Sequence, residues 1–173
     1  NLSSSLQETV SFFAGSFSHY GMTIIDGATA ASVLSRGWAN RNYCNVDESP
    51  LTCELRIHRP SFVIINIGTH WTNRNGEYLR TIVETIIDAG ALPIMTTKAD
   101  NLEGDYSINY QIAQIASDYD IPLWNLWRAV QELPGHGLDP YRQGGYMYLT
   151  PSGLEARRVT ALSVFDLVRQ AVD

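Results

Sequence analysis

The chain has 173 residues, of which 45% are hydrophobic, and 18 acidic against 12 basic residues give it a net charge of -6. This hydrophobic content supports one folded domain over 1–173 and excludes a disordered chain. The acidic balance argues against a nucleic-acid partner, because such a surface repels phosphate backbones.

The first half of the chain predicts a helix, a strand, a second helix, a loop and a second strand. Leu6, Val10 and Phe13 recur at helical spacing after a run of serines, which predicts a capped helix ending at Gly15. A run that is apolar and partly β-branched, "SFVIINIG", predicts a strand covered on both faces. The intervening elements are a strand over 21–27, a helix over 28–39 and a polar surface loop over 39–60.

From residue 76 onward, apolar runs alternate with helical patterns. Helices are predicted over 76–90, 106–120 and 151–172, and strands over 92–98 and 121–127. Strands that alternate with helices favour parallel pairing through right-handed crossovers. The sequence therefore predicts an α/β fold, a three-layer α/β/α sandwich with a mostly parallel, flavodoxin-like sheet, in which ligands bind beyond the carboxyl ends of the strands.

Cys44 and Cys53 enclose a short loop whose Asp47, Glu48, Ser49 and Pro50 favour a turn. A turn would bring the two sulfurs together, so a disulfide is the main interpretation. The alternatives are two unpaired small side chains or a metal site, and a metal is less favoured because no second Cys or His pair stands nearby. A disulfide would place the protein outside the cell or at its surface.

No cofactor, metal or membrane span is expected. The four histidines are scattered, without the spacing of metal ligands, and no stretch reaches the roughly 18 to 20 apolar residues of a membrane helix.

Several strings resemble blocks of the SGNH hydrolases, the GDSL-like esterases and lipases. "RPSFVIINIGT" looks like the strand that ends in the family's Gly-Thr-Asn-Asp block, "GALPIMTTKADN" like the next strand and loop, and "YLTPSG" like the approach to its last block. The resemblance implies an SGNH-like fold. In that family a serine attacks an ester, a histidine with an aspartate removes the proton, and serine, glycine and asparagine groups stabilise the oxyanion.

The resemblance maps the first catalytic positions onto altered residues. The Gly-Asp-Ser block has no counterpart, so the nucleophile and the first strand are expected to be absent from this chain. Gly27 matches the oxyanion glycine, or it is simply a turn residue. His70, followed by Trp71, takes the place of the oxyanion asparagine; a neutral imidazole can donate one hydrogen bond there.

The last block is altered as well. "GGYMYLT" places Tyr148 at the histidine position and Gly145 at the aspartate position. A phenol is a poor general base at neutral pH. His136 and Asp139 leave a shifted catalytic arrangement as a weaker alternative.

A binding role is considered for side chains at the strand ends. Aromatic faces with polar rims suit sugar rings or a partner's surface, and the candidates are Trp71, Asn73, Tyr141, Arg142, Tyr146 and Tyr148. The alternative is packing, because residues spaced by two alternate across an extended segment. Lys98 and Asp100 follow a strand directly, where they suit a loop near the site or an ordinary charge pair.

These observations lead to one expected function and one rival. The chain is expected to be a secreted SGNH-like module without catalysis that binds a ligand, a carbohydrate or acylated molecule, or assembles into a homo-oligomer or filament by strand addition. The rival is a serine ester hydrolase of acylated carbohydrate or lipid whose nucleophile lies on an upstream segment.

Overall fold

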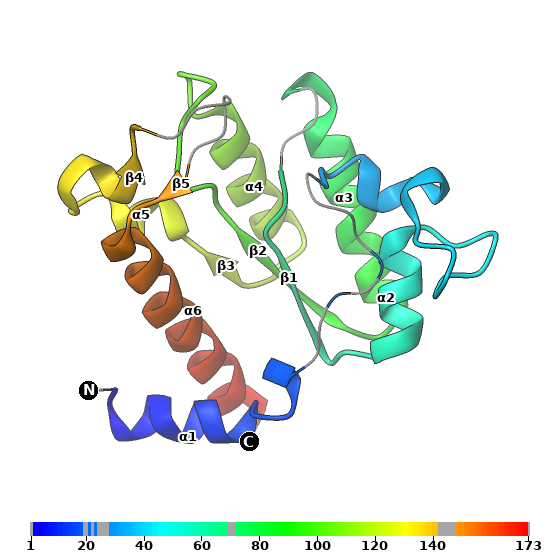
Figure 1. The fold of residues 1–173 in the computed structure, drawn as a ribbon, viewed down its shortest axis with the longest axis horizontal. Helices are drawn as coiled ribbons and strands as arrows, with labels where there is room; N and C mark the ends of the chain where they lie inside the picture. The colour runs from blue at the N-terminus through cyan, green and yellow to red at the C-terminus, as the bar shows by residue number, and fades with distance from the viewer. Residues whose placement is uncertain are drawn as a thin grey trace. The chain divides into compact units, whose positions relative to one another are not determined.

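The computed structural model of the chain describes residues 2–18, 21, 23, 28–68, 72–141 and 148–172. Within these ranges the fold is α/β, with six α-helices, a three-stranded and mostly parallel sheet, and a separate two-stranded pair (Figure 1). The contacts divide the chain into unit 1, residues 1–20 with 124–173, and unit 2, residues 21–123. The expectation of a single domain stays a prediction, and most of the strand expected over 21–27 lies outside the described residues.

The sheet of unit 2 is built on two parallel strands. β1 (Phe62–Ile65) pairs with β2 (Leu92–Thr96), so that Phe62 faces Leu92 and Ile65 faces Met95. β3 (Leu123–Trp124) follows β2 in the order β1-β2-β3. Because neighbouring strands follow one another in sequence, right-handed crossovers place both connecting helices on the same face of the sheet. The strands predicted over 61–68 and 92–98 are confirmed.

Those connecting helices, α3 (Thr72–Asp88) and α4 (Ser107–Asp118), supply most of the core of unit 2 and pack against β2 and one another. The fully or almost fully buried side chains of α3 recur at the helical spacing of three and four: Leu79, Ile82, Val83 and Ile86. α4 repeats the pattern with Ile108, Ile112, Ile115 and Ala116. The helices predicted from this spacing are confirmed.

The prediction of a helix over 28–39 is wrong. The structure has two short 3-10 turns instead, η2 (Ser32–Leu34) and η3 (Arg36–Trp38). Ser32 Oγ accepts a hydrogen bond from the backbone N–H of Thr29 at 2.6 Å, and Ser35 between the turns is extended. Short polar side chains that bond to the nearby backbone compete with helix formation, which explains the interruption.

The prediction of a loop throughout 39–60 is also wrong, because α2 (Pro50–His58) occupies its second half. Ser49 Oγ accepts from the N–H of Thr52, and Thr52 Oγ1 accepts from the N–H of Ser49, which makes a capping box. Pro50 is the first helical residue, where proline costs no hydrogen bond. Pro50, one of the residues that suggested a turn, therefore starts a helix.

Unit 1 contains α1 (Ser4–Phe12), α5 (Leu126–Val130), α6 (Pro151–Val172) and the antiparallel pair β4 (Leu138–Asp139) and β5 (Tyr148–Leu149). The helices expected at 4–15 and 151–172 are confirmed, and they pack on each other (Figure 1). The rings of Phe13 and Phe165 lie 5.2 Å apart. Among the described helices of both units, none is long and apolar enough to cross a membrane.

The strand predicted over 121–127 is only partly confirmed. It stops at Trp124, because the side chain of Asn125 accepts a hydrogen bond from the N–H of Arg128 at 2.9 Å and caps α5.

Candidate functional site

Five of the residues proposed from the sequence lie outside the described residues: Gly27, His70, Trp71, Arg142 and Tyr146. Their proposed roles stay predictions. The remaining candidates fall in both units: Asn73 and the cysteines in unit 2, and His136, Asp139, Tyr141 and Tyr148 in unit 1. Asn73 is an exposed residue of α3.

In unit 1, the β4–β5 pair brings Asp139 and Tyr148 together as directly opposed residues. Asp139 Oδ1 accepts a hydrogen bond from the backbone N–H of Tyr141 at 2.9 Å, which closes a local turn. The side chain of Tyr141 is left 89% exposed, and Tyr148 is 39% exposed. These three residues offer a carboxylate and exposed aromatic surface.

His136 also lies in unit 1, in a left-handed conformation with φ of 54°. Its Nδ1 lies 2.9 Å from the backbone carbonyl of Gln131. Because a carbonyl only accepts, Nδ1 carries the proton in this contact. No hydrogen bond or ion pair between His136 and Asp139 is found within the described part of the chain. Each of these two side chains instead bonds to nearby backbone.

In unit 2, the loop after β2 is closed by its own polar groups. Lys98 Nζ forms ion pairs with Asp100, at 3.0 Å, and with Glu103, and all three side chains are mostly buried. Asn109 Oδ1 accepts from the N–H of Lys98 at 2.8 Å, and its Nδ2 donates to the carbonyl of Lys98. The cation is thus neutralised within the loop, which favours a structural role for the predicted Lys98–Asp100 pair.

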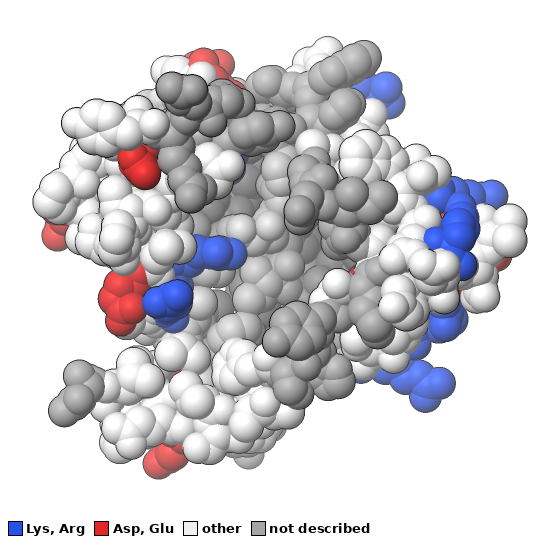
Figure 2. Space-filling model, viewed as in Figure 1, with Lys and Arg blue, Asp and Glu red and all other residues white. Residues whose placement is uncertain are grey.

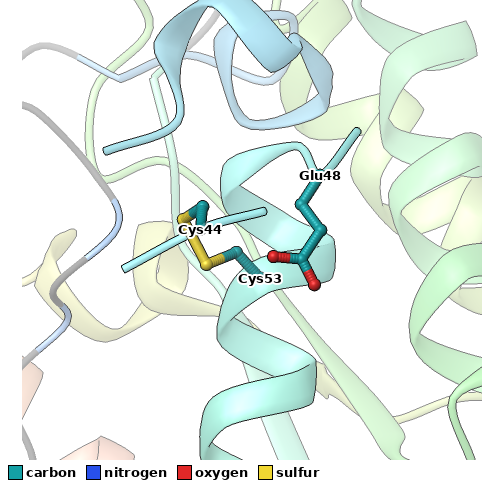
Figure 3. Close-up of side chains that lie close together, drawn as sticks. All are labelled: Cys44, Glu48 and Cys53. Atoms are coloured by element: carbon teal, nitrogen blue, oxygen red, sulfur yellow. A yellow bond between two sulfur atoms is a disulfide. The ribbon is translucent and has the colours of Figure 1, made fainter. Parts of the chain in front are cut away.

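The cysteine pair is confirmed at disulfide distance, with the sulfurs of Cys44 and Cys53 2.19 Å apart and the Cα atoms 5.4 Å apart. Glu48 lies beside the pair, so these three residues have the proximity of a metal site (Figure 3). Metal ligation requires thiolates, and two sulfurs bonded to each other supply none. The arrangement is therefore a covalent link between residue 44 and α2.

Arginine contacts reinforce this link. The guanidinium of Arg56 on α2 bonds to both carboxylate oxygens of Glu48, at 2.5 and 2.9 Å, and to the carbonyl of Tyr43 at 3.0 Å. The hydrogen bond from Arg56 lowers the pKa of Glu48 to about 2. Arg41 bonds in turn to the carbonyls of Arg36 and Asn45. The segment before α2 is thereby fixed at several points along its length.

This fixed segment carries exposed aromatic and basic side chains. Trp38 is 42% exposed, Tyr43 49% and Val46 86%, and Arg36 and Arg41 are exposed as well. Figure 2 shows basic side chains along the side of unit 2 that carries this segment and α2. We call Arg36, Trp38, Arg41, Tyr43 and Val46 the stapled surface. No sequence motif marks this surface; the only signal is that its aromatic and basic residues all lie within ten positions before Cys44, with Val46 between the two cysteines.

No protein-family model, curated protein or solved structure matches this chain. Its function therefore has to be inferred from its residues and their geometry.

Proposed function

We propose that this chain is an extracellular, SGNH-like module without hydrolase activity, which assembles with further copies of itself through the stapled surface. The observation that carries the proposal is the exposure of Trp38, Tyr43 and two arginines on a segment held by a disulfide. Trp, Tyr and Arg are the residues most enriched among those that dominate binding energy at interfaces. A segment that is already fixed also loses little conformational entropy on binding.

Charge supports a second copy as the partner. Residues 36–46 contain two arginines and no acidic residue, whereas the whole chain has a net charge of -6. An acidic chain offers complementary charge to a basic, aromatic surface. A contact between two different faces of identical chains would generate a ring or a filament.

The finer description of the fold belongs to the same proposal. The alternation of strands and helices from β1 to β3 supports an α/β arrangement of the SGNH type, and a further helix layer on the opposite face of the sheet, which would make it three-layered, belongs to the proposal. The disulfide supports secretion or display at the cell surface, since such bonds persist in oxidising compartments. The use of His136 Nδ1 and Lys98 in local contacts supports a non-catalytic role.

Sedimentation at several protein and salt concentrations tests the assembly. The chain is expected to associate as its concentration rises, and added salt should weaken the association because part of it is electrostatic. Trp38→Ala and Arg41→Glu should each reduce it. Tyr110→Ala, at a tyrosine of α4 that is 70% exposed, is the matched control and should leave it unchanged. Association that survives both substitutions in the stapled surface argues against this interface.

Carbohydrate binding at β4–β5 is a second candidate, supported by the 89% exposure of Tyr141 beside Asp139. Exposed aromatic rings next to carboxylates suit sugar recognition. A glycan array with the unsubstituted chain, Tyr141→Ala and Tyr110→Ala separates this function from self-assembly. Binding should be lost only in Tyr141→Ala.

The hydrolase alternative has its own test. A fluorophosphonate probe labels activated serines, so labelling of the mature protein would contradict the non-catalytic proposal.

A further inference from the structure

A small cavity lies inside unit 2, between the sheet and its two connecting helices. Its volume is about 10 Å³, and six of its eight lining residues are apolar, among them Ile65 and Met95. The other two are Asn75, on α3, and Thr96, the last residue of β2. The cavity is therefore lined mainly by apolar residues, with two polar side chains in its wall.

Both polar side chains are deeply buried and have unused hydrogen-bonding capacity. Asn75 is 2% exposed and Thr96 4% exposed. Within the described part of the chain, neither Asn75 Oδ1 nor Thr96 Oγ1 has a protein hydrogen-bond partner. Buried polar groups in native proteins are almost always paired with protein or with ordered water. Two such residues lining one cavity point to a common partner inside it.

The size of the cavity identifies that partner. A cavity of roughly 10 to 15 Å³ admits one water molecule. Any organic ligand is larger. The donor and acceptor pattern also fits, because a carboxamide oxygen accepts from water while a threonine hydroxyl can donate to it.

We propose that one buried water molecule occupies this cavity, donates a hydrogen bond to Asn75 Oδ1 and accepts one from Thr96 Oγ1. The water joins the N-terminal part of α3 to the end of β2. It thus acts as an internal cross-link at the edge of the sheet where the loops after β1 and β2 begin.

Direct observation of the water is the first test. A crystal structure that resolves ordered water should show one oxygen about 2.8 Å from both side-chain oxygens. In solution, the buried water should give cross-relaxation signals to the methyl groups of the cavity wall. A dry cavity, a direct bond between Asn75 and Thr96, or short contacts typical of a bound cation would each overturn the proposal.

Substitutions provide a second test. Thr96→Val keeps the side-chain shape and removes one partner, so the melting temperature should fall and the water signal should weaken. Asn75→Leu should lower the melting temperature in the same way. Each single variant leaves one buried polar side chain without its full set of hydrogen bonds, whereas the double variant leaves none. The fall in melting temperature of the double variant should therefore be clearly smaller than the sum of the two single falls.

Thr81→Val is the matched control. Thr81 is an exposed residue of α3 whose hydroxyl donates to the carbonyl of Glu77, and its substitution should change the melting temperature little. Strictly additive losses at Asn75 and Thr96 would contradict a shared water. If a variant fails to fold, the cross-relaxation measurement on the unsubstituted chain still decides the question.

Discussion

Ser5 and Asp166 are separated by 161 residues, yet Ser5 Oγ lies 2.8 and 2.7 Å from the two carboxylate oxygens of Asp166. Thr9 Oγ1 donates to the same carboxylate at 2.7 Å, and Arg169 lies 3.1 Å from it. These contacts fasten α1 to α6. The hydrogen bond from Ser5, followed by that from Thr9, lowers the pKa of Asp166 to about 2.

The first prediction concerns the pH dependence of stability. Because the pKa of Asp166 falls from 3.8 to about 2 on folding, the charged carboxylate stabilises the folded state above pH 3.8. That contribution is lost as the pH drops from near 4 to near 2. Urea titrations of the unsubstituted chain should therefore show a falling midpoint across this window, and Asp166→Asn should show a smaller fall. Part of the fall should remain, since Glu48 has a pKa lowered to the same value.

Superimposable pH profiles for the unsubstituted chain and Asp166→Asn would contradict this linkage. The variant Asp166→Asn with Glu48→Gln should be flatter than either single variant.

The second prediction concerns the disulfide. Cys44 and Cys53 are nine positions apart, so the bridge closes a short loop. A loop of this size stabilises the folded state by about 2 to 3 kcal/mol in the chain-entropy model. Replacing both cysteines with serine should lower the free energy of unfolding by about this amount in urea titrations. Reductant should destabilise the unsubstituted chain and leave the double variant unaffected.

The third prediction concerns the close approach of two glycines in unit 1. A Cβ atom on Gly153 would lie 2.3 Å from the carbonyl oxygen of Gly137, closer than any real contact. Gly153→Ala must displace the backbone, and overpacking of this kind costs about 1 to 3 kcal/mol or more. Gly37→Ala is the control, because its nearest neighbour, Ser35 Oγ, would be 3.7 Å away. Equal melting temperatures for the two variants would show that the glycine contact is not required.

The fourth prediction concerns the buried indole of Trp124, whose Nε1 donates to Thr160 Oγ1 at 3.0 Å. Thr160→Val leaves this N–H without its acceptor, at a cost of about 1 to 3 kcal/mol. Ser163→Ala removes another hydroxyl of α6, one that is exposed and bonds only to the carbonyl of Val159 in its own helix. Circular dichroism during urea unfolding should therefore show a clear loss of stability for Thr160→Val and little for Ser163→Ala.

The elements that the sequence predicted best are those that bury a regular apolar face. Ile82, Val83 and Ile86 on α3 show the helical period directly, and Ile94 and Met95 on β2 belong to a continuous apolar run. The period is a property of the local sequence, so no tertiary information was needed.

The wrong predictions, over 28–39 and 39–60, lie where hydrogen bonds from short polar side chains determine the backbone conformation. Thr29 and Ser32 bond to each other's backbone and interrupt a helical pattern, whereas Ser49 and Thr52 use the same chemistry to begin α2. Local composition does not separate these outcomes, because each depends on which of the competing hydrogen bonds the surrounding packing favours.

The candidate site was predicted less well than the fold. The cysteine pair followed from spacing and turn residues, and it is confirmed. Whether Trp38 and Tyr43 are exposed depends on whether distant segments of the chain cover them. From a sequence alone, a tryptophan is expected in a core or an interface more often than exposed by itself on a surface. Only the structure shows which of the two applies here.

The bridge between residues 44 and 53 also affects how the protein should be prepared. It holds a peripheral segment, while the apolar residues of β1, β2, α3 and α4 pack in a separate cluster. Protein produced in a reducing cytosol would therefore lack the bridge. It would keep the packed core of β1, β2, α3 and α4, while the stapled surface would lose its native conformation. Expression in an oxidising host is the condition under which its interactions can be measured.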